Sequence, residues 1–459
     1  MPYMLIDNFS RGMDRRRPIY AAEQGTVWDI QNGHLSRGGD IEKRKAFVAT
    51  YSLPVGQTKG LAAVGTKLYV FGHDATPAGI PAGVTYKRCS HTSPVGEILS
   101  VNGFDGKPYV IAEHDDASVR HYYDGTYFTS PSAGLGRYSF TMGSKNYCTD
   151  GSVLRFSAVN DPDDFGGTHS GTINLSNHDE GSETLYSMEQ FQGSLAVFAD
   201  SAIQIWNVSA DPLNNVHLQT IKRTGTKYPK TVLSFGEVDT FYLDNTGIRS
   251  LRARVSTNTG YVNDVGIAID TYVKEYMATL TADQLARSTS GIDNDGRFWM
   301  AVAGKIFVLS YFPGSKISGW TWYDPGFEVE ALAVKQGRVY VRNGDTIYLY
   351  GGGTDAVYDE SQVIVQLPFM NGGRPGHMES LLGMDIAAEG EWKCELLVDP
   401  RNLERKVQVG YLSGHTWHDL NAAAFALTGS VAPRLTSLTD DFASISAIGV
   451  SFTGQKIEN

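Results

Sequence analysis

The sequence has few cysteines, no excess of positive charge and no long apolar run. Its three cysteines, Cys89, Cys148 and Cys394, lie too far apart for a disulfide framework or a paired-cysteine zinc site, so we expect buried thiols. The 39 Lys and Arg residues are outnumbered by 50 Asp and Glu residues, which disfavours general binding to nucleic acid or anionic membranes. No stretch approaches the roughly 18 apolar residues of a membrane span, and the basic N-terminus lacks a signal-peptide core. We therefore expect synthesis in a reducing cytoplasm and no membrane insertion.

Glycine and aromatic residues are abundant, with 50 Gly, 24 Tyr, 20 Phe and 7 Trp in 459 residues. This mixture favours many short strands joined by tight turns. A unit of an apolar strand, a Gly-containing turn and further alternating strands recurs along the chain. The seven copies begin at Leu61, Leu99, Tyr138, Tyr186, Val232, Ser290 and Glu330.

The first turn of each copy contains a glycine that serves as an anchor for measuring the repeat. The anchors are Gly65, Gly106, Gly143, Gly193, Gly236, Gly296 and Gly337. Their mean spacing of about 45 residues is close to the length of one propeller blade. The predicted fold class is all-β, with a β-propeller of six or seven blades; the alternative is an unrelated series of hairpins in a sandwich.

Three further segments complete the predicted organisation. Residues 1–50 show little strand periodicity and are predicted to be an N-terminal arm or collar. The propeller is expected at 51–357, with a helical insertion near 270–287 in which Thr281 and Gln284 form a capping-box signature. The apolar stripe of this helix either packs the insertion onto the body or docks a partner. A Gly-rich joint then leads into a C-terminal β-sandwich at 358–459.

The motifs of common enzyme classes are missing from the sequence, and we predict no catalytic residue, cofactor site or metal site. There is no phosphate-binding loop, nucleophile elbow or paired-histidine metal motif. His114, Asp115, Asp116 and His121 are interpreted as turn residues rather than metal ligands, and the segment NDPDDF lacks the glycine and glutamate of the familiar calcium loop. The aromatic residues Trp299, Trp320, Trp322 and Tyr323 alternate along strands, which favours core packing over sugar stacking.

The N-terminal segment is basic and weakly periodic, so we expect it to need a partner for burial and to mediate assembly. The basic residues that we assign to an assembly interface are Arg11, Arg15, Arg16, Arg17, Lys43 and Arg44.

Three stretches resemble a known family. NFSRGMDRRRPIYAAEQGTVWDIQNGHLSRGGDIEKRKAFV, from Asn8 to Val48, is similar to the opening of the tail nozzle proteins of short-tailed bacteriophages, also called tail tubular protein B or tail hub. The matching positions are Gly12, Pro18, Gln31, Asn32, Gly33, Gly39, Lys43 and Arg44. Residues 191–212 and 293–314 are similar to later segments of the same family, the second to the packaged-DNA-stabilising hubs.

The resemblance implies a structural virion protein of the viral tail: a homohexameric ring that retains the packaged genome and conducts it during DNA ejection. Its implied partners are an adaptor at the head-to-tail connector, tail fibres or spikes, and passing double-stranded DNA bound without sequence specificity. A wall that repels phosphate would let a duplex slide. The acidic turn residues that we expect to line this channel are Glu113, Asp115, Asp116, Asp161, Asp163 and Asp164, together with the loop at 178–183. The alternative function is a carbohydrate-binding or glycan-cleaving propeller.

Overall fold

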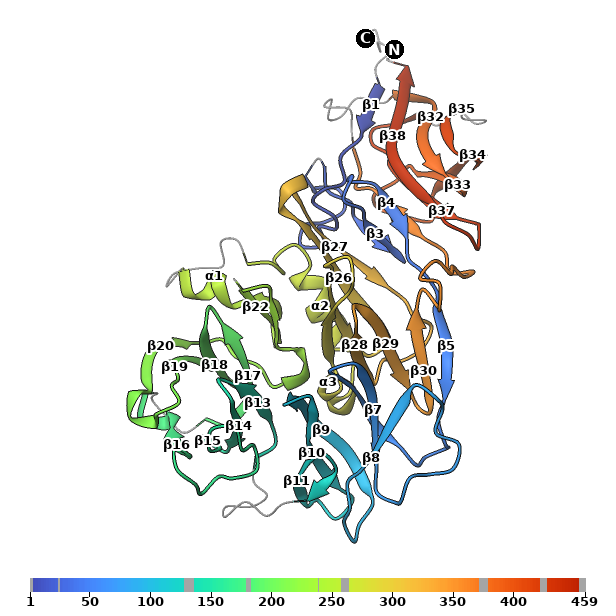
Figure 1. Cartoon of the computed structure of the whole chain (residues 1–459). Helices are drawn as coiled ribbons and strands as arrows, with labels where there is room; N and C mark the ends of the chain where they lie inside the picture. Colours follow the sequence, from blue (N-terminus) through green and yellow to red (C-terminus); the bar gives the residue numbers. More distant parts are fainter. Residues whose placement is uncertain are drawn as a thin grey trace.

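The computed structural model describes residues 3–23, 25–127, 136–178, 183–237, 239–256, 264–370, 379–421 and 427–453. These residues form a β-propeller and a β-sandwich that lie end to end (Figure 1). The fold is therefore all-β, as the composition predicts, with three short α-helices between the fifth and sixth blades.

The propeller has seven blades, each an antiparallel meander except for one parallel pair. Blade 1 contains β6 (Lys59–Val64), β7 (Lys67–Gly72) and β8 (Val84–Arg88), and blade 2 contains β9 (Val95–Phe104), β10 (Lys107–His114), β11 (Val119–Tyr123) and β12 (Thr126–Tyr127). Blade 3 contains β13 (Ser139–Met142), β14 (Lys145–Asp150), β15 (Val153–Phe156) and β16 (Gly171–Asn174). Blade 4 contains β17 (Leu185–Phe191), β18 (Ser194–Ala199), β19 (Ala202–Asn207) and β20 (Val216–Lys222). Blade 5 contains β21 (Leu233–Phe235), β22 (Asp239–Asp244) and β23 (Gly247–Ser250). Blade 6 contains β24 (Thr289–Ile292), β25 (Phe298–Val302), β26 (Lys305–Phe312) and β27 (Ile317–Tyr323). Blade 7 contains β28 (Ala331–Lys335), β29 (Arg338–Asn343), β30 (Thr346–Tyr350) and β5 (Phe47–Ser52). The parallel pair is β7 with β8.

The first strands of the blades form a closed ring around the propeller axis. Each contacts the first strand of the next blade, and β28 of blade 7 contacts β6 of blade 1. Blade 7 takes its outer strand, β5, from the beginning of the chain, so the ring is closed by pairing two segments that lie about 300 residues apart. All seven anchor glycines lie between the first and second strands of their blades and have positive φ, which explains why glycine recurs there.

The described residues of the insertion between blades 5 and 6 form three helices, α1 (Leu251–Ser256), α2 (Asp270–Met277) and α3 (Ala282–Ala286). The predicted capping box at the start of α3 is present: Thr281 accepts from the Gln284 backbone N–H, and the Gln284 side chain accepts from the Thr281 N–H. Val273 and Met277 of α2 are buried in a core that also contains blade 6 and the sandwich. The apolar stripe therefore packs the insertion onto the body.

The sandwich is built from both ends of the chain. One sheet has the order β3 (Gly33–Leu35), β4 (Ile41–Lys43), β38 (Ser444–Thr453), β32 (Glu379–Glu389) and β35 (Thr416–Asn421), with β1 (Tyr3–Ile6) on β38 and β36 (Leu427–Thr428) on β32. The other contains β31 (Ile364–Gln366), β37 (Ala432–Ser437), β33 (Glu391–Leu397) and β34 (Lys406–Ser413). Both β1 and β38 lie at the end of the molecule farthest from the propeller (Figure 1).

One strand joins the two halves of the molecule. Strand β2 (Asp29–Gln31) pairs in parallel with β27 of blade 6 and antiparallel with β31 of the sandwich, which makes one nine-stranded sheet. A single hydrophobic core continues across this junction and includes Phe9 and Met13, both fully buried. The prediction of a separate arm at residues 1–50 is therefore wrong, and the sandwich is not made of residues 358–459 alone.

The described part of the chain also has four 3-10 turns: η1 (Leu175–His178), η2 (Pro212–Asn214), η3 (Pro229–Thr231) and η4 (Pro313–Ser315). The three cysteines are free and buried, as expected, and burial raises the pKa of each thiol to about 12. Among the described residues, no helix is long and apolar enough to cross a membrane.

Candidate functional site

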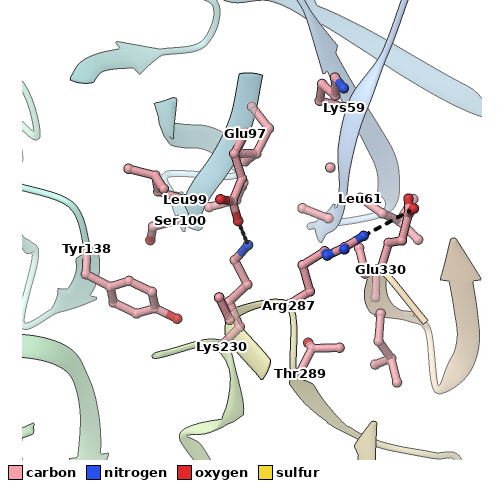
Figure 2. Close-up of a pocket in the computed structure, with 18 of the residues that line it drawn as sticks. Lys59, Leu61, Glu97, Leu99, Ser100, Tyr138, Lys230, Arg287, Thr289 and Glu330 are labelled. Carbon is pink, nitrogen blue, oxygen red and sulfur yellow. Dashed lines mark hydrogen bonds and ion pairs between the residues drawn. The ribbon is translucent and has the colours of Figure 1, made fainter. Parts of the chain in front are cut away.

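The propeller axis contains a cavity of about 780 Å³ (Figure 2). Its wall is formed by the first strands of blades 1, 2 and 7, by residues that lead into blades 3, 5 and 6, and by one face of α3. The charged or phenolic side chains that line it are Lys59, Glu97, Tyr138, Lys230, Asp283, Arg287 and Glu330. The cavity lies at the ring axis because every blade except blade 4 contributes residues at or near the start of its innermost strand.

An ion pair spans this cavity. Lys230 Nζ lies 2.8 Å from Glu97 Oε1, and Figure 2 shows the two side chains pointing toward one another. Glu97 belongs to blade 2, whereas Lys230 lies in η3, which leads into blade 5, so the pair reaches across the ring past blades 3 and 4. Their side chains are 45% and 24% exposed, respectively, which leaves both charges accessible to water.

A second ion pair lies beside the first. Arg287 Nη1 is 3.5 Å from Glu330 Oε1, joining the end of the helical insertion to blade 7. Arg287 also donates from Nε to the Asp283 carbonyl, and Glu330 accepts from the Gly344 N–H. These backbone contacts fix the two side chains at the mouth of the cavity.

The opposite side of the cavity holds Tyr138, whose pKa is raised because its phenol is buried. Nearby, the Glu189 carboxyl accepts from the Gln190 N–H and the Ser234 hydroxyl. Burial raises the pKa of Glu189 to about 7, so this carboxyl is partly protonated at neutral pH. The cavity thus carries charges of both signs on one side and a neutral phenol on the other.

The acidic residues predicted to line a channel lie outside the axial cavity. Near the end of β10, Glu113 pairs with Arg137, and in the turn that follows Asp116 lies 2.8 Å from His91 Nε2. The Asp115 N–H donates to the Pro94 carbonyl. These contacts order the turn beside the start of β9.

The second acidic group follows β15 of blade 3. Asp164 accepts from the N–H groups of Gly166 and Gly167. Asp163 lies against Asp161, and burial together with this neighbour raises the pKa of Asp163 to about 6. Within the loop at 178–183, residues 179–182 lie outside the described residues.

The basic residues predicted to mediate assembly divide into two groups. Arg11 and Arg17 both pair with Glu23, at 2.7 and 2.8 Å, and Arg16 is exposed. Arg15 stacks between the rings of Trp28 and Tyr272. These four side chains lie at or near the surface of the N-terminal segment.

Lys43 and Arg44 do not fit an assembly surface. Both are almost fully buried. Lys43 donates to the carbonyls of Asp359 and Thr439, and Arg44 bonds to Asn32, the Asp324 carbonyl and the Asp359 carboxylate. The two cations hold the N-terminal segment to the sandwich because buried charges need such partners. The sequence pattern of basic residues does not distinguish them from the exposed arginines.

The histidine and aromatic residues singled out by the sequence lie inside the blades. Within the described ranges, no group of three or more His, Cys, Asp or Glu side chains is arranged to hold a metal ion. His114 bonds to Tyr122 and His121 to Tyr109, both inside blade 2. The aromatic residues considered as sugar platforms are buried, which confirms their core role: Trp299, Trp320, Trp322 and Tyr323.

The charged residues of the cavity were not identified from the sequence. They are separated by up to 271 positions, from Lys59 to Glu330, and only ring closure brings them together. A signal was nevertheless present, because Lys59, Glu97, Lys230, Arg287 and Glu330 each stand six to nine positions before the anchor glycine of their blade. Aligning the repeats on those glycines would have placed them on one ring.

Comparison by sequence finds no matching family model and no matching curated protein. Among solved structures, a chain of the mitotic checkpoint complex is 14% identical, with a TM-score of 0.37 over 76% of this chain and 91% of that one. Virginiamycin B lyase from Staphylococcus aureus is 10% identical, with a TM-score of 0.35 over 74% and 94%. The extracellular domain of a putative one-component system from B. thetaiotaomicron is 8% identical, with a TM-score of 0.42 over 89% and 62%. Such remote likenesses carry no argument about function, and the propeller assignment rests on the sheet order of the chain itself.

Proposed function

We propose that the chain is a structural, non-enzymatic component of a bacteriophage tail, a nozzle or hub that helps to enclose the path of the packaged DNA. The observation that carries this proposal is the single nine-stranded sheet that joins propeller and sandwich. A wall that resists the pressure of a packaged genome needs subunits that do not flex at a linker. The resemblance at residues 8–48 supports the same function, and those residues supply the joining strand β2.

In this proposal the DNA passes between subunits of a hexameric ring and not through one propeller. The axial cavity of about 780 Å³ is much too small for a duplex, and the Glu97–Lys230 pair spans it. The formal charge of −11 suits a wall that repels phosphate. The acidic turns containing Glu113, Asp115 and Asp116, and Asp161, Asp163 and Asp164, remain the candidates to face such a channel.

The contact with the adaptor ring is assigned to the exposed part of the basic segment, Arg11, Arg16 and Arg17. Arg16 carries the most accessible charge of the three, because Arg11 and Arg17 share Glu23. Tail fibres or spikes are the further partners of the assembled ring. A glycan-binding or glycan-cleaving propeller remains the rival function, but the burial of Trp299, Trp320 and Trp322 removes its aromatic platform.

The proposal is tested by mixing the full-length protein with the adaptor ring of the phage that encodes it. Light scattering after size exclusion should detect six copies per ring, and the double variant Arg16→Glu/Arg17→Glu should reduce the bound copies. The matched variant Arg223→Glu, at an exposed position on the propeller, should bind normally. A chain that stays at its single-chain mass of 50.1 kDa and releases sugars from a polysaccharide would overturn the proposal.

A further inference from the structure

The axial cavity presents an equal number of positive and negative side chains. Lys59, Lys230 and Arg287 stand against Glu97, Asp283 and Glu330 around the same space. A simple anion would meet three carboxylates, a simple cation would meet three basic groups, and an apolar molecule would strip water from all six charges. The chemistry that matches this lining is a molecule with both an ammonium and a carboxylate.

The Glu97–Lys230 pair can admit such a molecule without losing its charge balance. Both side chains are partly exposed, so their mutual attraction is weakened by water and salt. A zwitterion inserted between them places its carboxylate against Lys230 and its ammonium against Glu97, which replaces one ion pair by two. Because the partners come from blades 2 and 5, the inserted molecule would lie across the axis.

Aliphatic residues also line the cavity, beside the charged ones. Leu61 of blade 1, Leu99 of blade 2 and Leu332 of blade 7 form this apolar part of the lining, together with Val101 and Val334. The volume of about 780 Å³ lies within the range of known small-molecule sites, roughly 300 to 1,000 Å³. An apolar side chain on the ligand would fit this region.

We propose that the axial cavity is a binding site for a small zwitterion with an apolar side chain, the chemistry of an amino acid or a short peptide. Glu97 and Lys230 are the primary contacts, and the Arg287–Glu330 pair forms the neighbouring edge of the site. The inference goes beyond the proposed tail function and does not depend on it.

Isothermal titration of the full-length protein tests the site with leucine and leucyl-leucine as probes. The comparison ligand is N-acetyl-leucine amide, which keeps the apolar side chain and lacks both charges. We expect heat of binding from at least one zwitterion and none from the capped compound at the same concentration. Lys230→Met should weaken zwitterion binding by about tenfold or more, as the loss of a charged hydrogen bond does.

The matched control is Lys227→Met, which removes a lysine three positions away that pairs with Asp200 on the surface. This variant should bind the zwitterion as the unchanged protein does. If Lys230→Met does not fold, as judged by circular dichroism, Glu97→Gln replaces it and should weaken binding in the same way. Absence of binding by both zwitterions, equal binding of the capped compound, or unchanged affinity in the folded cavity variant would each overturn the proposal.

Discussion

The propeller and the sandwich are assembled in opposite ways. Six of the seven blades are made of strands that follow one another in the chain, so most of their pairings are local. In the sandwich, by contrast, two strands from the N-terminal end of the chain, β1 and β4, both pair with β38 at the C-terminal end. Changes near the N-terminus should therefore act on the sandwich and blade 6, and changes in a blade turn should act locally.

Deletion of residues 1–17 should have the largest effect. It removes Phe9 and Met13, both fully buried in the shared core, and burial of such side chains contributes roughly 2 to 5 kcal/mol each. The total approaches the whole stability of a typical domain, so we expect aggregation or a greatly lowered melting temperature.

The control for this deletion is the removal of residues 1–6 alone, which takes away only the edge strand β1. It should leave melting close to that of the full chain. If deletion of residues 1–17 proved equally mild, the N-terminal segment would be a free arm after all.

Replacement of Arg44 by Leu should have the next largest effect. The guanidinium is buried, and its loss removes the donor to Oδ2 of Asp359 and the donor to the Asp324 carbonyl. Hydrogen bonds to charged groups contribute about 1.5 to 3 kcal/mol each, so the loss of these two should cost about 3 kcal/mol or more, to be measured by urea unfolding. Arg16→Ala, at an exposed position of the same segment, should change stability by less than about 0.5 kcal/mol. Equal costs for the two variants would contradict the separation of buried and exposed basic residues.

Acid should loosen the junction through His34 of β3. Its Nδ1 lies 2.9 Å from the Tyr323 hydroxyl of blade 6, and burial lowers its pKa from 6.5 to about 4. The folded state thus disfavours the protonated ring. The contribution of neutral His34 to the free energy of unfolding is therefore complete above pH 6.5 and is lost as pH falls toward 4. The loss amounts to about 3 kcal/mol. His34→Gln should flatten the dependence of unfolding free energy on pH across this window. Identical slopes for the variant and the unchanged protein would show that the pH dependence does not come from His34.

The smallest effects are expected from alanine substitutions at two glycines that both have positive φ. At Gly193, in a blade turn, an added methyl meets nothing within 4 Å, so Gly193→Ala should cost only the backbone strain of about 1 kcal/mol. At Gly12 the methyl would lie 2.7 Å from Gly319 Cα and the Trp320 backbone. Gly12→Ala should therefore cost at least about 1 kcal/mol more by thermal unfolding. Equal costs would show that the N-terminal segment does not pack closely on blade 6.

The difference between local and distant strand pairings explains which features the sequence predicts and which it does not. The anchor glycines and the Thr281–Gln284 capping box are local signals, and the blades and α3 appear where those signals predict them. Strands β2, β3 and β4 have only three residues each, too few to show alternation. Strand β3 pairs with its neighbour β4, but the partners of β2 and the second partner of β4 lie hundreds of positions away. The charged residues of the cavity could not be predicted for a related reason, since Glu97 and Lys230 meet only when the ring closes.

The central claim, that the N-terminal segment belongs to one folded body with blade 6 and the sandwich, is tested most directly by native-state hydrogen exchange. The backbone amides of β2 and β4 should exchange as slowly as those of β31 and β38, with which they pair. Slow exchange in all four strands, lost together under mild denaturant, is the predicted result. Exchange of β2 and β4 within seconds, while β31 and β38 remain protected, would contradict the account.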